Sequence, residues 1–162
     1  MTVWALGPKY ITYKRGICLI RILFVCHGNI CRSPMAEFVM KDMARRAGCA
    51  DRFVIASAAT TTDDLGSDMY PRAKEELKRH GVPFKRRQAR QLRRGEYADW
   101  DHIVAMDGEN LADIPVILGA DPERKVRLLL SFEGEERPVS DPWYTRDLRR
   151  PTGIYPRAAR LC

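Results

Sequence analysis

The sequence lacks the long apolar segments of membrane proteins and the paired cysteines of secreted ones. No apolar run in its 162 residues approaches the roughly 20 residues that span a bilayer. The 5 cysteines are odd in number, which argues against a disulfide framework and favours a reducing compartment. Residues 1–19 do not form a convincing signal peptide, because their apolar stretch is broken and no small-residue cleavage site follows. We therefore expect a cytoplasmic protein without a membrane anchor.

The sequence also offers little that would bind a metal or a nucleic acid. Its 3 histidines share no ligand spacing, and neither a zinc-finger pattern nor an aromatic RNA-binding signature is present. The formal net charge of +7 favours anionic partners, but phosphate esters suit that charge as well as nucleic acids do. The Arg-rich segments 85–94 and 146–160 are most simply interpreted as solvated surface. We expect a single domain that needs no metal or other cofactor.

Apolar and helical segments alternate along the chain, which predicts an α/β fold with a parallel sheet. Strands are expected at 20–25, 53–58, 102–106 and 126–130, and helices at 34–47, at 70–79 and from Glu109 onward. In such folds, ligands bind beyond the carboxyl ends of the strands.

The segment I-L-F-V-C-H-G-N-I-C-R-S-P, residues 22–34, carries the strongest chemical signal. A buried strand delivers Cys26 to a turn that contains Gly28 and Asn29, and a helix opens at Pro34. A strand end, a tight loop and a helix start together direct several backbone N–H groups at one point. That arrangement suits a tetrahedral dianion.

Arg32 lies within the same loop and can present a planar fork to two phosphate oxygens, which a lysine cannot do. The amides and the guanidinium favour a thiolate at Cys26, so we predict that Cys26 attacks phosphorus and forms a thiophosphate. The alternative is that Cys26 is an unreactive core cysteine, because the Cys-x5-Arg spacing by itself is common. The order of strand, Gly, Asn, Arg, Ser and Pro favours the functional interpretation.

This segment resembles the signature of the low-molecular-weight protein tyrosine phosphatases. The resemblance extends, in the family's order, over S-A-A-T (57–60), P-R-A (71–73), R-H-G-V (79–82), A-R-Q-L (89–92), A-M-D (105–107) and D-P-W-Y (141–144). It implies a four-stranded parallel sheet with helices on both faces and the phosphate-binding loop between the first strand and the first helix. It also implies hydrolysis of phosphotyrosine and small aryl phosphates.

The same resemblance places the second catalytic group at Asp141. Expulsion of a tyrosine phenolate benefits from a proton donor, and hydrolysis of the thiophosphate needs a base. One carboxyl group can serve both steps, with Trp143 and Tyr144 as walls of the pocket. The default interpretation of Asp-Pro is a turn, and we interpret the second copy, Asp121-Pro122, as a turn only.

Supporting roles follow from the resemblance as well. Asn29 is expected in a left-handed conformation, tied by hydrogen bonds to Ser33, Ser57 and His80. Ser33 is expected to donate a hydrogen bond to the Cys26 thiolate and so improve it as a leaving group. Taken alone, His80 would more often be a helix C-terminal cap.

The resemblance gives the rest of the phosphate-binding loop a role in substrate binding. That set comprises His27, Gly28, Asn29, Ile30, Cys31 and Ser33. In relatives, the cysteine at position 31 can form a reversible disulfide with the nucleophile. His27 and Asp63 depart from the familiar animal enzymes. An acidic wall at Asp63 would cost affinity for a dianion unless the side chain points to solvent, which leaves the preference for phosphotyrosine peptides open.

The two ends of the chain depart from the family pattern. Residues 1–19 are interpreted as a disordered arm or a start-site artefact, residues 20–147 as the phosphatase domain, and residues 148–162 as an aberrant tail. Pro151, Gly153 and Pro156 exclude the regular helix that covers the sheet in the family. When the tail is back-translated with free choice of codons and then read one base out of register, it can encode S-K-T-Y-R-D-I-S-A-G-C-A-A-L. That sequence fits the expected helix. We interpret the tail as frameshifted, so that the C-terminal helix is missing or disrupted.

Three other functions are compatible with a loop of this kind. Arsenate reductases of the related type need further cysteines downstream, and the sequence has none between Cys49 and Cys162. Protein arginine phosphatases of this fold carry threonine where this chain has Ile30. A non-catalytic phosphate-binding relative is the third, although Cys26, Arg32 and Asp141 are all present. For a phosphatase, the resemblance implies phosphotyrosine-protein partners, such as a bacterial tyrosine kinase, and neither a nucleic acid nor a membrane.

Overall fold

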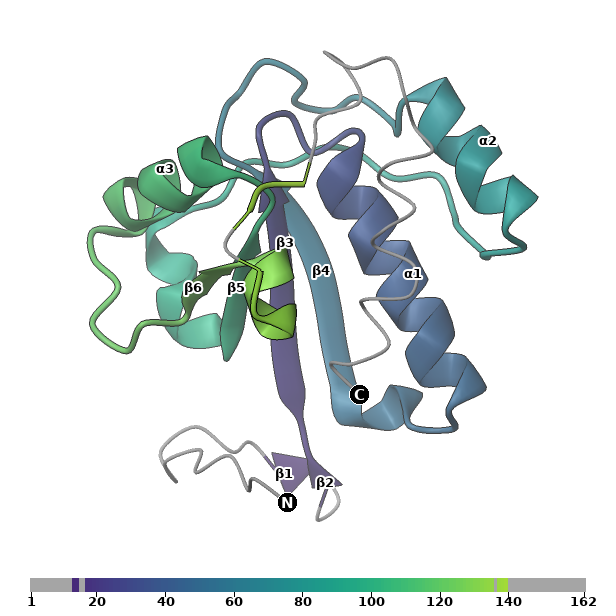
Figure 1. The fold of residues 1–162 in the computed structure, drawn as a ribbon, viewed down its shortest axis with the longest axis horizontal. Helices are drawn as coiled ribbons and strands as arrows, with labels where there is room; N and C mark the ends of the chain where they lie inside the picture. Colours follow the sequence, from purple (N-terminus) through teal and green to yellow (C-terminus); the bar gives the residue numbers. More distant parts are fainter. Residues whose placement is uncertain (1–12, 15–16, 136, 140–162) are drawn as a thin grey trace.

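A parallel sheet forms the centre of the molecule in the computed structural model, which describes residues 13–14, 17–135 and 137–139. The sheet has four strands in the order β4-β3-β5-β6, and all neighbouring pairs are parallel (Figure 1). Its strands are β3 (Ile20–Cys26), β4 (Phe53–Ala59), β5 (His102–Ala105) and β6 (Val126–Leu128). The predicted four-stranded parallel sheet is confirmed.

Helices cover both faces of this sheet, as predicted. Figure 1 shows α1 on one side and α3 on the other, while α2 packs against α1. The helices are α1 (Arg32–Arg46), α2 (Pro71–Arg79) and α3 (Gly108–Leu118), with 3-10 helices η1 (Ala50–Arg52), η2 (Arg94–Asp99) and η3 (Leu129–Glu133). The layers are therefore helix, sheet and helix.

Strand β3 shows why both faces of the sheet are apolar. Successive side chains of a strand point to opposite faces. Ile22 and Phe24 join the core cluster on the α1 face, whereas Leu23 and Val25 join the cluster on the α3 face. All four side chains are at most 2% exposed. A strand buried on both faces reads as a continuous apolar run, and this run carries Cys26 to the carboxyl edge of the sheet.

Two element boundaries differ by two residues from the sequence-based expectation, whereas the other predicted boundaries agree to within one residue. Helix α1 begins at Arg32 rather than Pro34, because the Cys31 carbonyl already accepts a helical hydrogen bond, at 3.1 Å, from the amide of Met35. Strand β6 ends at Leu128 rather than at residue 130. The hydroxyl of Ser131 donates to the Leu128 carbonyl at 2.8 Å, and the chain turns into η3 there.

The chain before β3 contributes two short strands. In the predicted arm, β1 (Tyr13–Lys14) and β2 (Ile17–Cys18) pair antiparallel. The rest of the arm before β1 and the predicted frameshifted tail 148–162 lie outside the described residues. Within the part of the chain that the structure describes, no helix is long and apolar enough to cross a membrane.

Candidate active site

A cavity of about 250 Å³ opens at the carboxyl edge of the sheet, beside the end of β3. The structure brings most of the predicted loop residues to it. Its lining consists of Cys26, His27, Gly28, Ile30, Cys31, Arg32, Asp63, Asp64, Tyr70, Asp107 and Glu109. The volume would accept a phosphate group with part of an aromatic ring.

Cys26 is the last residue of β3, and its side chain is buried between the strand and the start of α1. Its Sγ lies 3.0 Å from Oγ of Ser33 and 3.5 Å from the backbone nitrogen of Ser33. Ser33 belongs to the first turn of α1, so the sulfur faces the positive end of the helix dipole. This environment suits an anion at the sulfur.

Arg32 is held at the cavity by a carboxylate that sequence reasoning left out of the catalytic set. Its side chain is 3% exposed, and its Nη1 donates to Oδ2 of Asp107 at 2.5 Å. The other oxygen of Asp107 accepts from the backbone N–H of Asn110 at 2.8 Å and so caps α3. In the sequence, Asp107 lies between a buried strand and a helix. This position was the signal by which sequence reasoning could have identified it as a site residue.

Asn29 adopts the left-handed conformation that the resemblance implied, with φ of 56°. Its side chain is fully buried, and Nδ2 donates to Oγ of Ser33 and to Oγ of Ser57, each at 2.9 Å. These two predicted bonds are present. They tie the phosphate-binding loop to α1 and to β4.

The predicted bond from Asn29 to His80 is absent, although the structure describes both side chains. His80 instead forms the C-terminal cap of α2, and its Nε2 lies 3.1 Å from Oε1 of Glu76 one turn earlier. These contacts favour the interpretation of His80 as a helix C-terminal cap.

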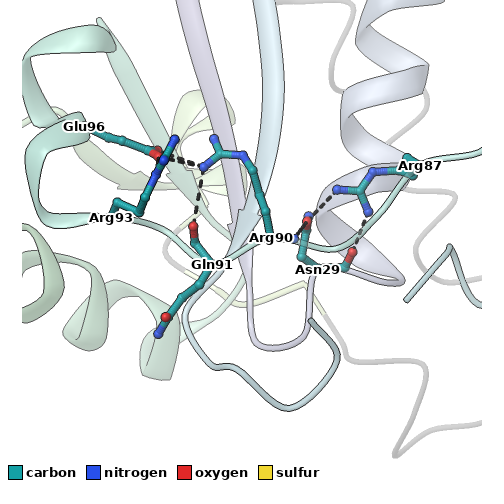
Figure 2. A network of polar contacts seen from close by, with 6 residues as sticks. All are labelled: Asn29, Arg87, Arg90, Gln91, Arg93 and Glu96. Carbon is teal, nitrogen blue, oxygen red and sulfur yellow. Dashed lines mark hydrogen bonds and ion pairs between the residues drawn. The ribbon is translucent and has the colours of Figure 1, made fainter. Parts of the chain in front are cut away.

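Arg87 takes the place that was expected for His80. Its Nη1 donates to the backbone carbonyl of Asn29 at 2.7 Å, and its Nη2 donates to Oδ1 of Asn29 at 2.5 Å (Figure 2). The backbone N–H of Arg90 also donates to Oδ1, at 3.2 Å. The interpretation of residues 85–94 as solvated surface is wrong for both arginines, because they pack against the loop.

A backbone pairing holds this arginine segment in position. The Ala59 amide at the end of β4 donates to the Arg90 carbonyl, and the Leu92 amide donates to the Ala59 carbonyl, both at 2.8 Å. The Arg90 side chain is held in place as well, because its Nη1 donates to Oε1 of Glu96 at 2.7 Å (Figure 2).

Burial lowers the pKa of Arg87. The negative charges of Glu37, Cys26 and Asp68 act in the opposite direction and raise it. Glu37 and Asp68 therefore compensate part of the desolvation of this guanidinium. The Asp68 carboxylate additionally accepts from the backbone N–H of Arg87 at 3.3 Å.

The two departures on the pocket wall form a pair with each other. Nε2 of His27 lies 3.0 Å from Oδ2 of Asp63, and the two side chains are 44% and 65% exposed. Asp63 lines the cavity, but its carboxylate is largely exposed to solvent and paired with the histidine, so the electrostatic cost that it could impose on a bound dianion is reduced.

The predicted residues Asp141, Trp143 and Tyr144 lie outside the described residues. The described chain comes to the cavity two positions before Asp141. Nη1 of Arg32 donates to the Val139 carbonyl at 3.4 Å, and the Val139 amide donates to the Met106 carbonyl at 2.7 Å.

Neither a metal centre nor a disulfide occurs in the described parts of the chain. There, no group of three or more His, Cys, Asp or Glu side chains could hold a metal ion. Cys26 and Cys31 both line the cavity, and they do not form a disulfide with each other.

The sequence of this chain is similar to known phosphatases over most of its length. A family model described as low molecular weight phosphotyrosine protein phosphatase matches residues 21–150. The chain is 35% identical over 129 residues to the low molecular weight protein-tyrosine-phosphatase YfkJ of Bacillus subtilis, covering 78% of this chain and 83% of that protein. It is 33% identical over 144 residues to the human low molecular weight phosphotyrosine protein phosphatase, covering 87% of this chain and 90% of that protein.

Solved structures give the same result. The crystal structure of Bacillus subtilis YfkJ superimposes with a TM-score of 0.84 at 34% identity, over 91% of this chain and 94% of that one. A Drosophila arginine phosphatase superimposes with a TM-score of 0.76 at 28% identity, over 88% and 93% of the two chains. This fold is therefore shared by a protein named as a tyrosine phosphatase and one named as an arginine phosphatase.

Proposed function

The chain belongs to the low molecular weight phosphotyrosine protein phosphatase family, and on this basis we propose that it hydrolyses phosphotyrosine in proteins through a phosphocysteine on Cys26. It is accordingly a phosphoric monoester hydrolase. The observation that carries the proposal is the position of Cys26 Sγ, buried at the end of the central strand, 3.0 Å from the Ser33 hydroxyl and in the same cavity as Arg32.

Phosphate binding is the first task of the site. The backbone N–H groups at the start of α1 carry partial positive charge, and the Arg32 guanidinium adds a full one. Asp107 holds that guanidinium in a fixed orientation at 2.5 Å, so little side-chain freedom is lost when the substrate binds.

The first chemical step transfers the phosphoryl group to the protein. The Cys26 thiolate attacks phosphorus, an S–P bond forms, and the bond between phosphorus and the phenolic oxygen breaks. Asp141 donates its proton to that oxygen, so that tyrosine leaves as a neutral phenol.

The second step restores the thiolate. Asp141, now ionised, takes a proton from water, and the water oxygen attacks phosphorus while the S–P bond breaks. The departing sulfur carries the negative charge, and the hydroxyl of Ser33 at 3.0 Å donates a hydrogen bond to it. Inorganic phosphate is released.

Asp141 is a better proton donor for this chemistry than Asp107, although Asp107 lines the cavity. Both oxygens of Asp107 already accept hydrogen bonds, one from Arg32 and one from the Asn110 amide. Because these donors engage both oxygens, the carboxyl group of Asp107 is committed to holding Arg32 and capping α3. The position of Val139 at Arg32 supports a role for the D-P-W-Y segment that follows it.

Two features of the site favour phosphotyrosine over the alternatives. Ile30 places an apolar side chain in the cavity lining, and an apolar wall suits an aromatic ring better than a phosphorylated guanidinium. The presence of Cys26 and Arg32 together in the cavity favours turnover over simple phosphate binding.

The substrate experiment compares a phosphotyrosine peptide, a phosphoarginine peptide and p-nitrophenyl phosphate under the same conditions. We expect the phosphotyrosine peptide and the aryl phosphate to be hydrolysed, with a much lower kcat/KM for phosphoarginine. The matched variant Ile30→Thr should move the preference toward phosphoarginine. A wild-type preference for phosphoarginine would contradict the tyrosine assignment while leaving the Cys26 chemistry in place.

We further propose a cytoplasmic location and, among physiological substrates, an autophosphorylating bacterial tyrosine kinase. A reactive thiolate and an odd number of cysteines suit a reducing compartment. The kinase rests on the family resemblance, and dephosphorylation of such a kinase in the purified system is its direct test.

A further inference from the structure

The lining of the cavity divides into two unlike parts. The phosphate-binding loop between β3 and α1 supplies the first part. Beyond that loop, the lining that the structure describes consists of four carboxylate residues and one aromatic residue, namely Asp63, Asp64, Asp107, Glu109 and Tyr70. A phosphate held in the loop directs the group attached to it past this second part. The only Phe, Trp or Tyr side chain that such a group meets in the described lining belongs to Tyr70.

The backbone of Tyr70 is fixed to the phosphate-binding loop. Its amide donates to the Ile30 carbonyl at 2.9 Å, and its own carbonyl accepts from the Ala73 amide at 3.0 Å in the first turn of α2. Pro71 follows at the start of α2 and favours an extended conformation for the residue before it, as the φ of −53° and ψ of 133° of Tyr70 show. The position of Tyr70 relative to the loop is therefore set by backbone contacts on both sides.

The side chain of Tyr70 is held by packing as well. It is half-buried and packs against the core cluster on the α1 face of the sheet. A tyrosine side chain offers a large flat surface and has few rotatable bonds to immobilise when a ligand binds. Tyr70 therefore has the properties of a preformed wall.

The carboxylates of the lining indicate which way a substrate ring turns. The faces of an aromatic ring are electron-rich and its edges are electropositive. A ring that turned a face toward Asp63 or Asp64 would be repelled by the carboxylate. With one face on Tyr70, the ring can direct an edge toward these carboxylates. Stacking on Tyr70 is the arrangement that satisfies both contacts.

We propose that Tyr70 is a specificity-determining residue and forms the wall against which the aryl ring of the substrate stacks. The inference deepens the proposed function and rests on it, because it requires an aryl phosphate as the substrate. It assigns the aromatic contact to the segment that precedes α2, since the aspartate at position 63 cannot supply one.

The test compares the binding of phenylphosphonate and methylphosphonate, which carry the same anionic group and differ in the ring. Each ligand protects Cys26 from alkylation by iodoacetamide, and the dependence of protection on ligand concentration gives a Kd without any turnover. Because Cys31 also lines the cavity, peptide fragmentation in the mass spectrometer locates the alkylated cysteine. The quantity of interest is the ratio of the two Kd values.

We expect the wild type to bind phenylphosphonate about tenfold more tightly than methylphosphonate, through apolar contact and stacking. Tyr70→Ala should lose most of that preference, while Tyr70→Phe keeps the ring and should keep the preference. A Tyr70→Ala variant that binds both ligands more weakly by the same factor would show that Tyr70 only supports the loop. That result, or an unchanged ratio, would overturn the proposal.

Tyr70→Leu carries the test if Tyr70→Ala does not fold, because leucine keeps an apolar side chain against the core. It cannot stack, so the ratio should still fall severalfold. Phe84→Leu is the matched control. Phe84 is a half-buried aromatic residue at the same core cluster, outside the cavity lining, and its ring centre lies 6.3 Å from that of Phe38. A loss of the ratio in Phe84→Leu equal to that in Tyr70→Leu would contradict the assignment, and thermal unfolding confirms that each variant is folded.

This measurement separates the inference from the proposed function. A chain that prefers phenylphosphonate through Tyr70 but hydrolyses no phosphate ester would refute the phosphatase mechanism and leave the stacking wall in place. A chain that hydrolyses phosphotyrosine peptides, but keeps the full preference in Tyr70→Ala, would refute the wall and leave the phosphatase mechanism in place.

Discussion

The guanidinium of Arg32 and the carboxylate of Asp107 form a hydrogen-bonded ion pair at 2.5 Å between residues 75 positions apart in the sequence. The pair joins the start of α1 to the N-terminal cap of α3, so two of the three layers meet at the cavity. The orientation of the phosphate-binding guanidinium thus depends on the end of β5, where the sheet positions Asp107.

Replacement of Asp107 by asparagine should lower kcat/KM roughly tenfold, because Arg32 loses a charged partner and some of its fixed orientation. Stability should change little, since asparagine is also a good N-terminal cap for α3. Steady-state kinetics together with thermal unfolding separates the two effects. Asp113→Asn, on the same helix but outside the cavity lining, is the control, and a loss of equal size there would contradict the role of the pair.

Arg32→Lys should lower kcat/KM roughly a hundredfold, although the charge is kept. A lysine ammonium offers no planar fork to two phosphate oxygens and cannot reproduce the buried bond to Asp107. Inhibition by inorganic phosphate measures the binding part of the loss. Unchanged phosphate inhibition in a folded Arg32→Lys variant would show that Arg32 does not hold the phosphate.

Gly28 should tolerate alanine only when Asp64 is shortened. A Cβ at position 28 would collide with Oδ2 of Asp64, which would have to swing away. We expect Gly28→Ala to lose about threefold to tenfold in kcat/KM because the loop shifts by a fraction of an ångström. The double variant with Asp64→Ala should recover most of that activity, and a double variant no better than Gly28→Ala would refute the steric explanation.

Asp68 should make stability depend on pH in the acid range. The hydrogen bond from Lys74, supported by the backbone amides of Met69 and Arg87, lowers the pKa of Asp68 from 3.8 to about 2. A depressed carboxyl pKa contributes stability above the unfolded value, and that contribution is lost as the pH falls through the folded value. Asp68→Asn should therefore cost about 1 kcal/mol at pH 6, after allowance for solvent screening, and almost nothing near pH 2. Urea unfolding of both proteins at the two pH values measures this, and an equal cost at both would contradict it.

Local patterns in the sequence predict much of this structure. The apolar run before Cys26 predicts a buried central strand, and the order of Gly, Asn, Arg, Ser and Pro predicts the loop and the helix that follow. These signals are local, because a strand end, a turn and a helix start each depend on neighbouring residues.

The predictions that the structure did not bear out depend on contacts between segments that are far apart in the sequence. The R-H-G motif drew attention to His80, but that histidine caps its own helix and contacts Glu76 instead of Asn29. Arg87 lies in a basic stretch that resembles solvated surface. It becomes a structural residue only because a backbone pairing between Ala59 and the Arg90–Leu92 segment brings it to Asn29. No periodicity within the stretch distinguishes the packed arginine from the exposed Arg86 beside it.

Rapid acid quenching shows whether a phosphoryl group passes through Cys26 during turnover. The purified chain is mixed with p-nitrophenyl phosphate, quenched within one turnover and digested, and the peptides are analysed by mass spectrometry. We predict a phosphoryl group on the peptide that contains Cys26, none in Cys26→Ser, and a slower release of p-nitrophenol in Asp141→Ala. Turnover by the wild type with no phosphoryl group on Cys26, or undiminished turnover by folded Cys26→Ser, would show that hydrolysis does not pass through a phosphocysteine.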